Sequence, residues 1–315
     1  MHLSRYLLLL WVAILVGAQG IESVDPEIEV ILVKIGGSSI THKGEKESLN
    51  DEALAWFSQT LESLIARSYR SPADDRCESD SLDESARSVA FVVVHGAGSF
   101  GHFSAKAYGL KGQTENPQNS SNHSSLDTTE RRFRMQGVSE TRLSVQKLNR
   151  LVVSSLVDHG INSVGISPCF GIPHLQAYAT NEKGALTSLS TVVRETLNAG
   201  LVPVLHGDAC LGFGDDAGIL SGDTLMEVLG KTSWVSRVVF ITDVDGVYTE
   251  DPRKNPEGAK LLQYIPVDGS TGDITTDVSA SGSSHDHDVT GGLRVRNSMC
   301  LDQMCIMHRF RLTPH

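Results

Sequence analysis

A glycine loop flanked by two histidines is the part of the chain best suited to chemistry. The loop, His95-Gly-Ala-Gly-Ser-Phe-Gly-His102, directly follows an apolar, β-branched run at residues 89–94 that is typical of a buried strand. Glycines let the backbone turn its N–H groups toward a ligand, and the histidines add donors for an anionic oxygen. One such loop alone is more often a simple turn. A second glycine loop and a later Asp-rich strand end follow the same logic, so together they predict a phosphate site.

Two lysines flank the second glycine loop. Lys34 lies at the end of an apolar segment at residues 29–35, and Lys43 follows beyond a Gly-Gly-Ser turn. Phosphoryl transfer needs positive charge near the donor, the migrating group and the acceptor, and two lysines could supply it. Lys43 by itself is more often a solvated loop residue. Lys34 needs a partner, because an unpaired charge within an apolar strand is costly.

Strands alternate with helices along the chain, which predicts right-handed crossovers and a mainly parallel sheet. Strands are expected at residues 29–35, 89–94, 161–166, 201–205 and 237–242, and helices at 50–69, 133–159, 184–198 and 221–229. Polar surface loops are expected at 71–88, 111–129 and 271–288. Ligands bind at the carboxyl ends of parallel strands, where the glycine loops and the Asp-rich segment after residue 242 should meet.

Composition limits the possible partners. The 315 residues suit one large or two small α/β domains, and the formal net charge of −11 without a basic stripe argues against nucleic acid. Lysines, histidines, backbone amides or Mg²⁺ must therefore meet any anionic ligand locally. The cysteines are scattered, odd in number and without a CxxC pair, so we expect reduced thiols: Cys77, Cys169, Cys210, Cys300 and Cys305.

The first 20 residues have the pattern of a secretory signal peptide or a hydrophobic N-terminal extension. A basic start precedes an apolar core and small residues at a possible cleavage point. The apolar run is short for a stable membrane span, so none is expected. Glycosylation sequons at Asn119 and Asn122 add little, because such triplets arise by chance in Ser-rich loops.

Several motifs in one order carry a resemblance to a known family. They are Lys34-Ile-Gly-Gly-Ser-Ser-Ile-Thr-His-Lys43, the loop at 95–102, Val204-Leu-His-Gly-Asp208, Leu220-Ser-Gly-Asp223 and Thr242-Asp-Val-Asp-Gly-Val-Tyr-Thr249. Together they resemble the isopentenyl phosphate kinases of the amino acid kinase family. The last motif marks the wider family. The Gly-Ser-Phe-Gly-His run marks the narrower group, since relatives that act on carboxylates or carbamate lack its final histidine, although fosfomycin-type kinases resemble it here too.

The resemblance implies an α/β fold, a three-layer αβα sandwich with a mainly parallel central sheet, over residues 29–296. An acceptor-binding part would span about residues 29–210, and a nucleotide-binding part about residues 211–296. Residues 1–20 would precede this domain, and residues 297–315 would form a divergent tail. Homodimers are common in the family, so a homodimer is possible.

On the nucleotide side, the resemblance implies that ATP lies over the turn after Lys34. The residues expected to bind it are Lys34, Gly36, Gly37, Ser38, Gly98, Asp243, Gly291 and Arg296. Lys43 would stabilise the transferring phosphoryl group, and Asp223 would orient both lysines. An Asp at a helix start is more often simply a cap, and both roles are compatible. Mg²⁺ would bridge the ATP phosphates and need no dedicated protein ligands.

On the acceptor side, the resemblance implies that His102 donates to the phosphate of isopentenyl phosphate, with Ala97 and Gly207 lining the same pocket. The product would be isopentenyl diphosphate. A phosphate monoester is already nucleophilic, so the site mainly has to bring two anions together and neutralise them. The helix at 133–159 would cover the isoprenoid tail. Its candidate lining residues, most of them better explained as ordinary core, are Phe133, Met135, Val138, Leu143 and Val145.

The chain departs from the family pattern near its end. The turn Asp288-Val-Thr-Gly-Gly292 matches a late glycine turn of the family, but Arg296 stands where the family has lysine. Residues 297–315 have no clear family match, and an apparently truncated or divergent end would expose apolar sheet surface.

Two alternatives to isopentenyl phosphate kinase activity stay open. One is a related kinase for another small phosphate or phosphonate. The other is a catalytically dead nucleotide-binding regulator, against which the intact Lys34, Lys43 and His102 argue. ATP and substrate are available in the cytosol, which is the expected compartment. A secretory route through residues 1–20 is the alternative.

Overall fold

The computed structural model describes residues 28–68, 88–112, 127–169, 183–211, 217–242, 249, 255–262 and 305–309. The strands are β1 (Ile28–Ile35), β2 (Ser88–His95), β3 (Lys111–Gly112), β4 (Ser163–Ile166), β5 (Val202–His206), β6 (Asp208–Leu211), β7 (Ala217–Leu220), β8 (Arg237–Thr242) and β9 (Cys305–Arg309). The helices are α2 (Gly37–Ile40), α3 (Asp51–Ser68), α4 (Gly98–Ala107), α5 (Thr128–Asp158), α7 (Lys183–Asn198) and α8 (Gly222–Gly230).

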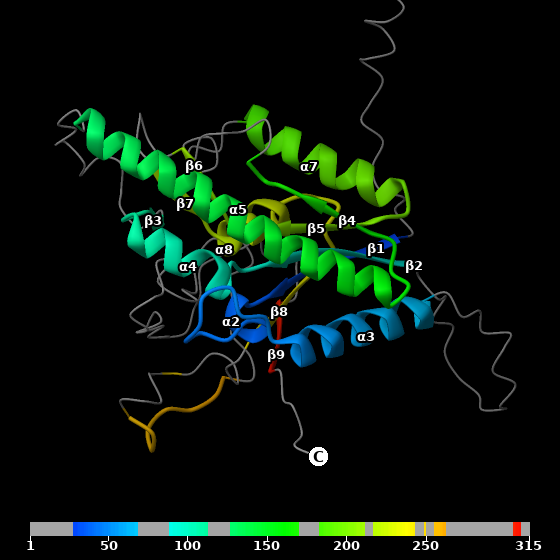
Figure 1. The fold of residues 1–315 in the computed structure, drawn as a ribbon. Coiled ribbons are helices and arrows are strands. Elements are labelled where there is room, and N and C mark those ends of the chain that lie inside the picture. The colour runs from blue at the N-terminus through cyan, green and yellow to red at the C-terminus, as the bar shows by residue number, and fades with distance from the viewer. Residues whose placement is uncertain are drawn as a thin grey trace, which may run out of the picture.

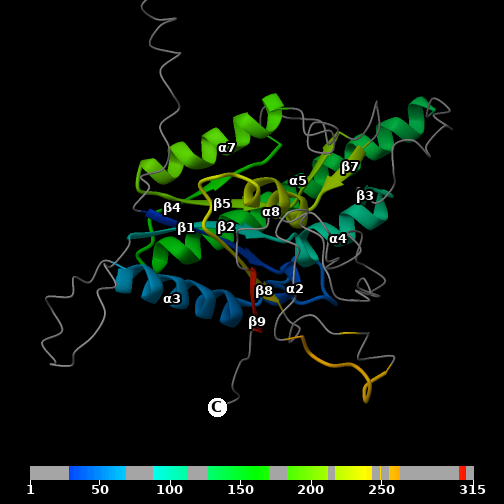
Figure 2. The same cartoon turned by 180° about the vertical axis from the view of Figure 1, so that it is seen from behind.

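A six-stranded sheet forms the centre of the fold, in the order β4-β5-β2-β1-β8-β9. Every pairing in this sheet is parallel, which confirms the predicted α/β fold with a mainly parallel central sheet. Helices α7 and α8 lie on one face, and α3 and α5 lie on the other (Figures 1 and 2). The carboxyl ends of β1, β2 and β5 therefore meet at one edge, where the glycine loops begin.

Alternation along the strands divides the core between the two faces. In β1, Val30 and Leu32 pack with residues of α7 and α8, whereas Val33 and Ile35 pack with residues of α3 and α5. Successive strand residues point to opposite faces, so Lys34 shares the α8 face with Leu32. Helices pack on both faces of the central strands, which explains why these strands are almost continuously apolar.

Helix α5 spans 31 residues and runs along the central sheet and a second, smaller sheet (Figure 1). Its buried positions recur every three or four residues and form one stripe, as an amphipathic helix requires: Gly137, Thr141, Ser144, Val145, Leu148, Asn149, Val152 and Leu156. The second half of the stripe packs on the central sheet. The first half lies over a smaller sheet in the order β3-β7-β6, which the sequence analysis did not predict.

Two features of the rest of the chain were not predicted. Residues 305–309, within the divergent tail, form β9, which pairs in parallel with β8 from Val238 opposite Cys305 to Thr242 opposite Arg309 and is the edge strand of the central sheet. Cys169 and Cys210 form a disulfide with their Cα atoms 6.4 Å apart, within the usual range. The expectation of reduced thiols was wrong for this pair because sequence spacing does not show that the end of β4 lies beside β6. In the part of the chain that the structure describes, no helix is long and apolar enough to cross a membrane.

Candidate active site

Two glycine turns touch each other at the carboxyl edge of the central sheet. A Cβ atom added to Gly37 would lie 2.3 Å from the backbone nitrogen of Gly98, and one added to Gly96 would lie 2.7 Å from the nitrogen of Gly37. Gly98 also has a φ of +51°, which favours glycine. The turns after β1 and β2 therefore pack backbone against backbone, and only glycine permits this approach.

A third loop joins them from β5. The Gly207 N–H donates to the carbonyl oxygen of His95 over 3.1 Å. A Cβ atom on Gly207 would lie 3.3 Å from the nitrogen of Gly222, and one on Gly222 would lie 3.5 Å from Cε of Lys34. The start of α8 and the loops after β1, β2 and β5 thus converge around Lys34. This arrangement is suited to anions, because the N-termini of α4 and α8 and a cation share one edge.

Lys34 has the partner that its position in an apolar strand requires. Its Nζ lies 2.6 Å from Oδ1 of Asp223, with side-chain exposures of 14% and 31%. Ser221, and not Asp223, caps α8, since Ser221 Oγ accepts the Thr224 N–H over 3.1 Å. The carboxylate of Asp223 is therefore available to orient Lys34. Asp223 orienting Lys43 as well stays a prediction.

Lys43 lies in the exposed turn of a small hairpin that follows α2. A bridge between Thr41 and Leu49 closes the hairpin. Ser99, in the first turn of α4, holds it in place: the Ser99 N–H donates to Thr41 Oγ1 over 3.0 Å, and Ser99 Oγ donates to the Ser48 carbonyl over 3.1 Å. His102 lies one turn further along α4 and is half-buried. The segments that carry Lys43 and His102 are thus joined through Ser99.

The remaining predicted residues divide into two groups. Gly36, whose N–H donates to the Ile241 carbonyl over 2.9 Å, belongs with Ser38 and the half-buried Ala97 to the glycine turns at this edge. The other group lies outside the described residues and comprises Asp243, Gly291 and Arg296.

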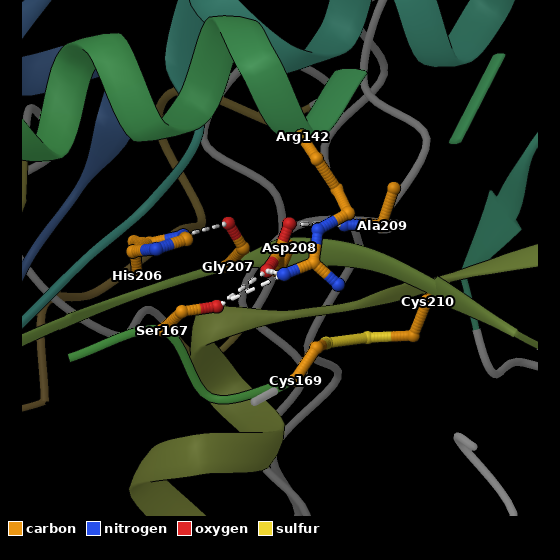
Figure 3. A network of polar contacts seen from close by, with 8 residues as sticks. All are labelled: Arg142, Ser167, Cys169, His206, Gly207, Asp208, Ala209 and Cys210. Carbon is orange, nitrogen blue, oxygen red and sulfur yellow. Dashed lines mark hydrogen bonds and ion pairs between the residues drawn. A yellow bond between two sulfur atoms is a disulfide. The ribbon is translucent and has the colours of Figure 1, made fainter. Parts of the chain in front are cut away.

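A buried carboxylate beneath the β5 loop was not assigned a role by the sequence analysis (Figure 3). Asp208 Oδ2 accepts from Ser167 Oγ over 3.2 Å and lies 3.4 Å from Nη2 of Arg142. Its Oδ1 accepts the Ala209 N–H over 2.9 Å. Burial raises the pKa of Asp208, while His206 and Arg142 act in the opposite direction. The only hint in the sequence was that Asp208 directly follows the His-Gly pair after a strand.

The candidate tail-covering residues of α5 point in different directions. Val145 is fully buried against the start of α4, where a Cβ atom on Gly101 would lie 2.9 Å from it. Met135 and Val138 pack on an apolar cluster between α4, α5 and the smaller sheet. Leu143 is 72% exposed, so it does not line an enclosed pocket.

Comparison with known proteins now places this site in a family. The amino acid kinase family profile matches residues 29–304. The chain belongs to the amino acid kinase family. Among curated relatives, isopentenyl phosphate kinase of Arabidopsis thaliana is 34% identical over 290 residues, covering 85% of this chain and 81% of the relative. Isopentenyl phosphate kinase of Methanothermobacter thermautotrophicus is 33% identical over 272 residues, covering 84% and 83%.

Solved structures agree with the family assignment. X-ray structures of isopentenyl phosphate kinase match with a TM-score of 0.53 and 28% identity, over 76% of this chain and 81% of that one. An isopentenyl phosphate kinase substrate complex matches with a TM-score of 0.50 and 25% identity, over 75% and 79%. The resemblance to the isopentenyl phosphate kinases is thereby confirmed. As a member of the amino acid kinase family, the protein is a phosphotransferase that uses ATP.

Proposed function

We propose that the protein transfers the γ-phosphoryl group of ATP to isopentenyl phosphate, giving ADP and isopentenyl diphosphate. An oxygen of the acceptor phosphate forms a bond to the γ-phosphorus, and the bond from that phosphorus to the oxygen bridging to the β-phosphate breaks. The named relatives support this acceptor. No strong base is needed, because the attacking phosphate oxygen is already anionic.

The observation that carries the choice of acceptor is an apolar cluster next to the proposed phosphate contacts. On α4, Ala105 lies one turn after His102 and is buried in the cluster. Ala209 lies two residues after Gly207 and is buried in the same cluster. A phosphate held by His102 and Gly207 would therefore have apolar side chains within reach of its substituent. That arrangement suits a short hydrocarbon tail better than the charged carbon skeleton of an amino acid.

The glycine turns and lysines supply the proposed charge neutralisation. Lys34, oriented by Asp223, would contact the ATP phosphates together with the N–H groups of Gly37 and Gly98. Lys43 would stabilise the migrating phosphoryl group from its hairpin. Mg²⁺ would arrive bound to ATP and bridge its phosphates. Oriented positive charge is effective here because the transition state spreads negative charge over the transferring group.

The test is ADP release by the purified full-length protein given Mg²⁺-ATP and isopentenyl phosphate, with the product identified by mass. Parallel reactions would contain other small phosphates, a phosphonate, or glutamate as the carboxylate control. We expect isopentenyl diphosphate and no reaction with glutamate. If the enzyme prefers a phosphonate or another phosphate, that compound replaces isopentenyl phosphate as the proposed acceptor. ATP binding without turnover of any acceptor would identify a catalytically dead regulator.

We propose the cytosol as the compartment, because ATP and Mg²⁺ are available there. The Cys169–Cys210 disulfide, like the signal-peptide pattern of residues 1–20, favours the oxidising secretory route instead. A fluorescent fusion at the C-terminus tests this, together with N-terminal sequencing of the purified chain. Fluorescence in the secretory pathway, together with a purified chain that lacks residues 1–20, would overturn the cytosolic assignment.

A further inference from the structure

Two buried histidines end neighbouring strands and make the same contact. His95 of β2 and His206 of β5 are partners in the parallel register, with ring centroids 5.8 Å apart. Their exposures are 0% and 1%. In each, Nδ1 lies 3.0 Å from the carbonyl oxygen of the following glycine, Gly96 or Gly207. Both rings therefore hold the peptide that begins a loop of the proposed acceptor site.

Asn149 of α5 determines which nitrogen of His95 carries the proton. Asn149 Nδ2 lies 3.1 Å from His95 Nε2 and 3.2 Å from the Val204 carbonyl oxygen. An amide nitrogen only donates, so Nε2 must accept, and the ring proton must be on Nδ1. Nδ1–H then donates to the Gly96 carbonyl. Burial, with His206 nearby, lowers the pKa of His95 to about 3, so the ring is neutral at physiological pH.

The place of Asn149 is itself specified by the fold. A Cβ atom on Gly165 of β4 would lie 2.3 Å from Asn149 Oδ1, so only glycine at this position leaves room for the amide. Asn149 is 8% exposed. Gly165, Asn149, His95 and Gly96 thus form a continuous series of contacts from β4 to the glycine loop.

The contact between His95 and the Gly96 carbonyl determines the direction of the Ala97 N–H, which belongs to the same peptide group. A trans peptide directs its N–H opposite to its C=O, so holding the Gly96 carbonyl against the imidazole turns the Ala97 N–H away from the ring. We infer that His95, held as its Nδ1–H tautomer by Asn149, is a positioning residue that aims the Ala97 N–H at the acceptor phosphate. This inference rests on the proposed function. It assigns the histidine at the start of the loop a role separate from that of His102.

The first measurement is the tautomer of His95 in the full-length, ¹⁵N-labelled protein. Long-range imidazole ¹H–¹⁵N spectra distinguish protonated from unprotonated ring nitrogens without any turnover. We expect the proton on Nδ1 at pH 7. A proton on Nε2 would overturn the inference.

The second measurement follows the Ala97 amide resonance as isopentenyl phosphate is added. We expect a large shift in the wild type and a much smaller one in Asn149→Leu. A wild-type protein that shows the shift but makes no product would refute the proposed function and leave the inference standing. An Ala97 resonance that does not move while product forms would refute the inference alone.

The third measurement separates positioning from folding. In Asn149→Leu and His95→Leu, we expect KM for isopentenyl phosphate to rise at least tenfold while KM for ATP stays within about twofold. His95→Asn, whose amide can replace Nδ1–H, should return KM to within about threefold of wild type. Asn162→Leu, on an exposed site, is the matched control. A fall in kcat with KM unchanged, or no rescue by His95→Asn, would indicate a purely structural role and overturn the inference.

Discussion

The Nζ atom of Lys34 lies 2.6 Å from the Oδ1 atom of Asp223, although 189 residues separate them in sequence. This pair joins the carboxyl end of β1 to the first turn of α8 on the face of the sheet that α8 covers. It places a cation, largely shielded from solvent, among the glycine loops.

Removing the charge of Lys34 should impair catalysis more than folding. In Lys34→Met we expect kcat to fall about 10²–10³-fold, because an oriented charge at a developing anion contributes that much. Asp223→Asn keeps Lys34 but loses its orientation, so a smaller loss of about tenfold is expected. Steady-state kinetics with saturating ATP give both values. Lys231→Met, which breaks the exposed Lys231–Glu227 pair on α8, is the control. Equal effects in all variants would contradict a specific role for the ion pair.

Changing His102 to alanine should separate acceptor chemistry from nucleotide binding. We expect turnover of isopentenyl phosphate to fall at least about 10²-fold, since a donor to the reacting phosphate is lost. ATP binding, measured by calorimetry, should change little. His159→Ala, between α5 and β4, serves as the comparison. Full turnover in His102→Ala would remove His102 from the mechanism.

Gly37→Ala should destabilise the protein by forcing two backbone turns apart. The added Cβ atom would lie 2.3 Å from the Gly98 nitrogen, and backbone at that distance must shift. Overpacking of this kind costs about 1–3 kcal/mol, which urea unfolding would measure. Gly44→Ala is the control, because nothing lies within 4 Å of its Cβ position. Similar unfolding free energies for the two variants would show that the turns can separate at little cost.

His95 makes stability depend on pH in a definite direction. Because burial lowers its pKa from 6.5 to about 3, the unfolded chain binds one more proton than the folded protein between these values. The free energy of unfolding should therefore fall as the pH drops below 6.5, by up to about 1.4 kcal/mol per pH unit. Urea unfolding between pH 7 and pH 5 should show a shallower slope for His95→Asn, which does not titrate. Identical slopes would mean that His95 is protonated in the folded state.

The Cys169–Cys210 disulfide should be detectable and stabilising. A bridge across a separation of 41 residues typically contributes about 2–4 kcal/mol. Peptide mapping without reductant should find the two cysteines linked, and reduction should lower the free energy of unfolding by that amount. Free alkylation of both thiols in the unreduced, folded protein would contradict the pairing.

Local patterns predicted much of the fold. The apolar runs that became β1, β2, β5 and β8 are buried on both faces, so their composition alone indicated strands of a parallel sheet. Helices α3 and α7 were expected within one residue of their observed bounds, because three- and four-residue apolar spacing is a strong signal. Lys34 was expected to need a partner, and the family resemblance, not a local pattern, named Asp223 as the residue that orients both lysines.

The features that were missed depend on distant contacts or short segments. Strands β6 and β7 have four residues each, too few for a periodic signal. The contact of Asn149 with His95 joins residues 54 apart, and neither residue looks unusual in its own segment. Ser167, Arg142 and Asp208 likewise meet only because β4, α5 and β6 pack together. Sequence order carries no information about such meetings without a homologous structure.

The position of β1 in the sheet also delays the completion of its own pairing during synthesis. β1 lies between β2 and β8 in the sheet. The Val30 N–H donates a hydrogen bond to Ser236 Oγ, which is 206 residues away in sequence. At about 5–20 residues per second, ribosomal synthesis takes about 10–40 s to cover that distance. Throughout this interval one edge of an apolar strand has no native neighbour and can pair with another nascent chain. The wait of β1 for β8 therefore leaves one edge of an apolar strand open to wrong pairing while the intervening residues are synthesised.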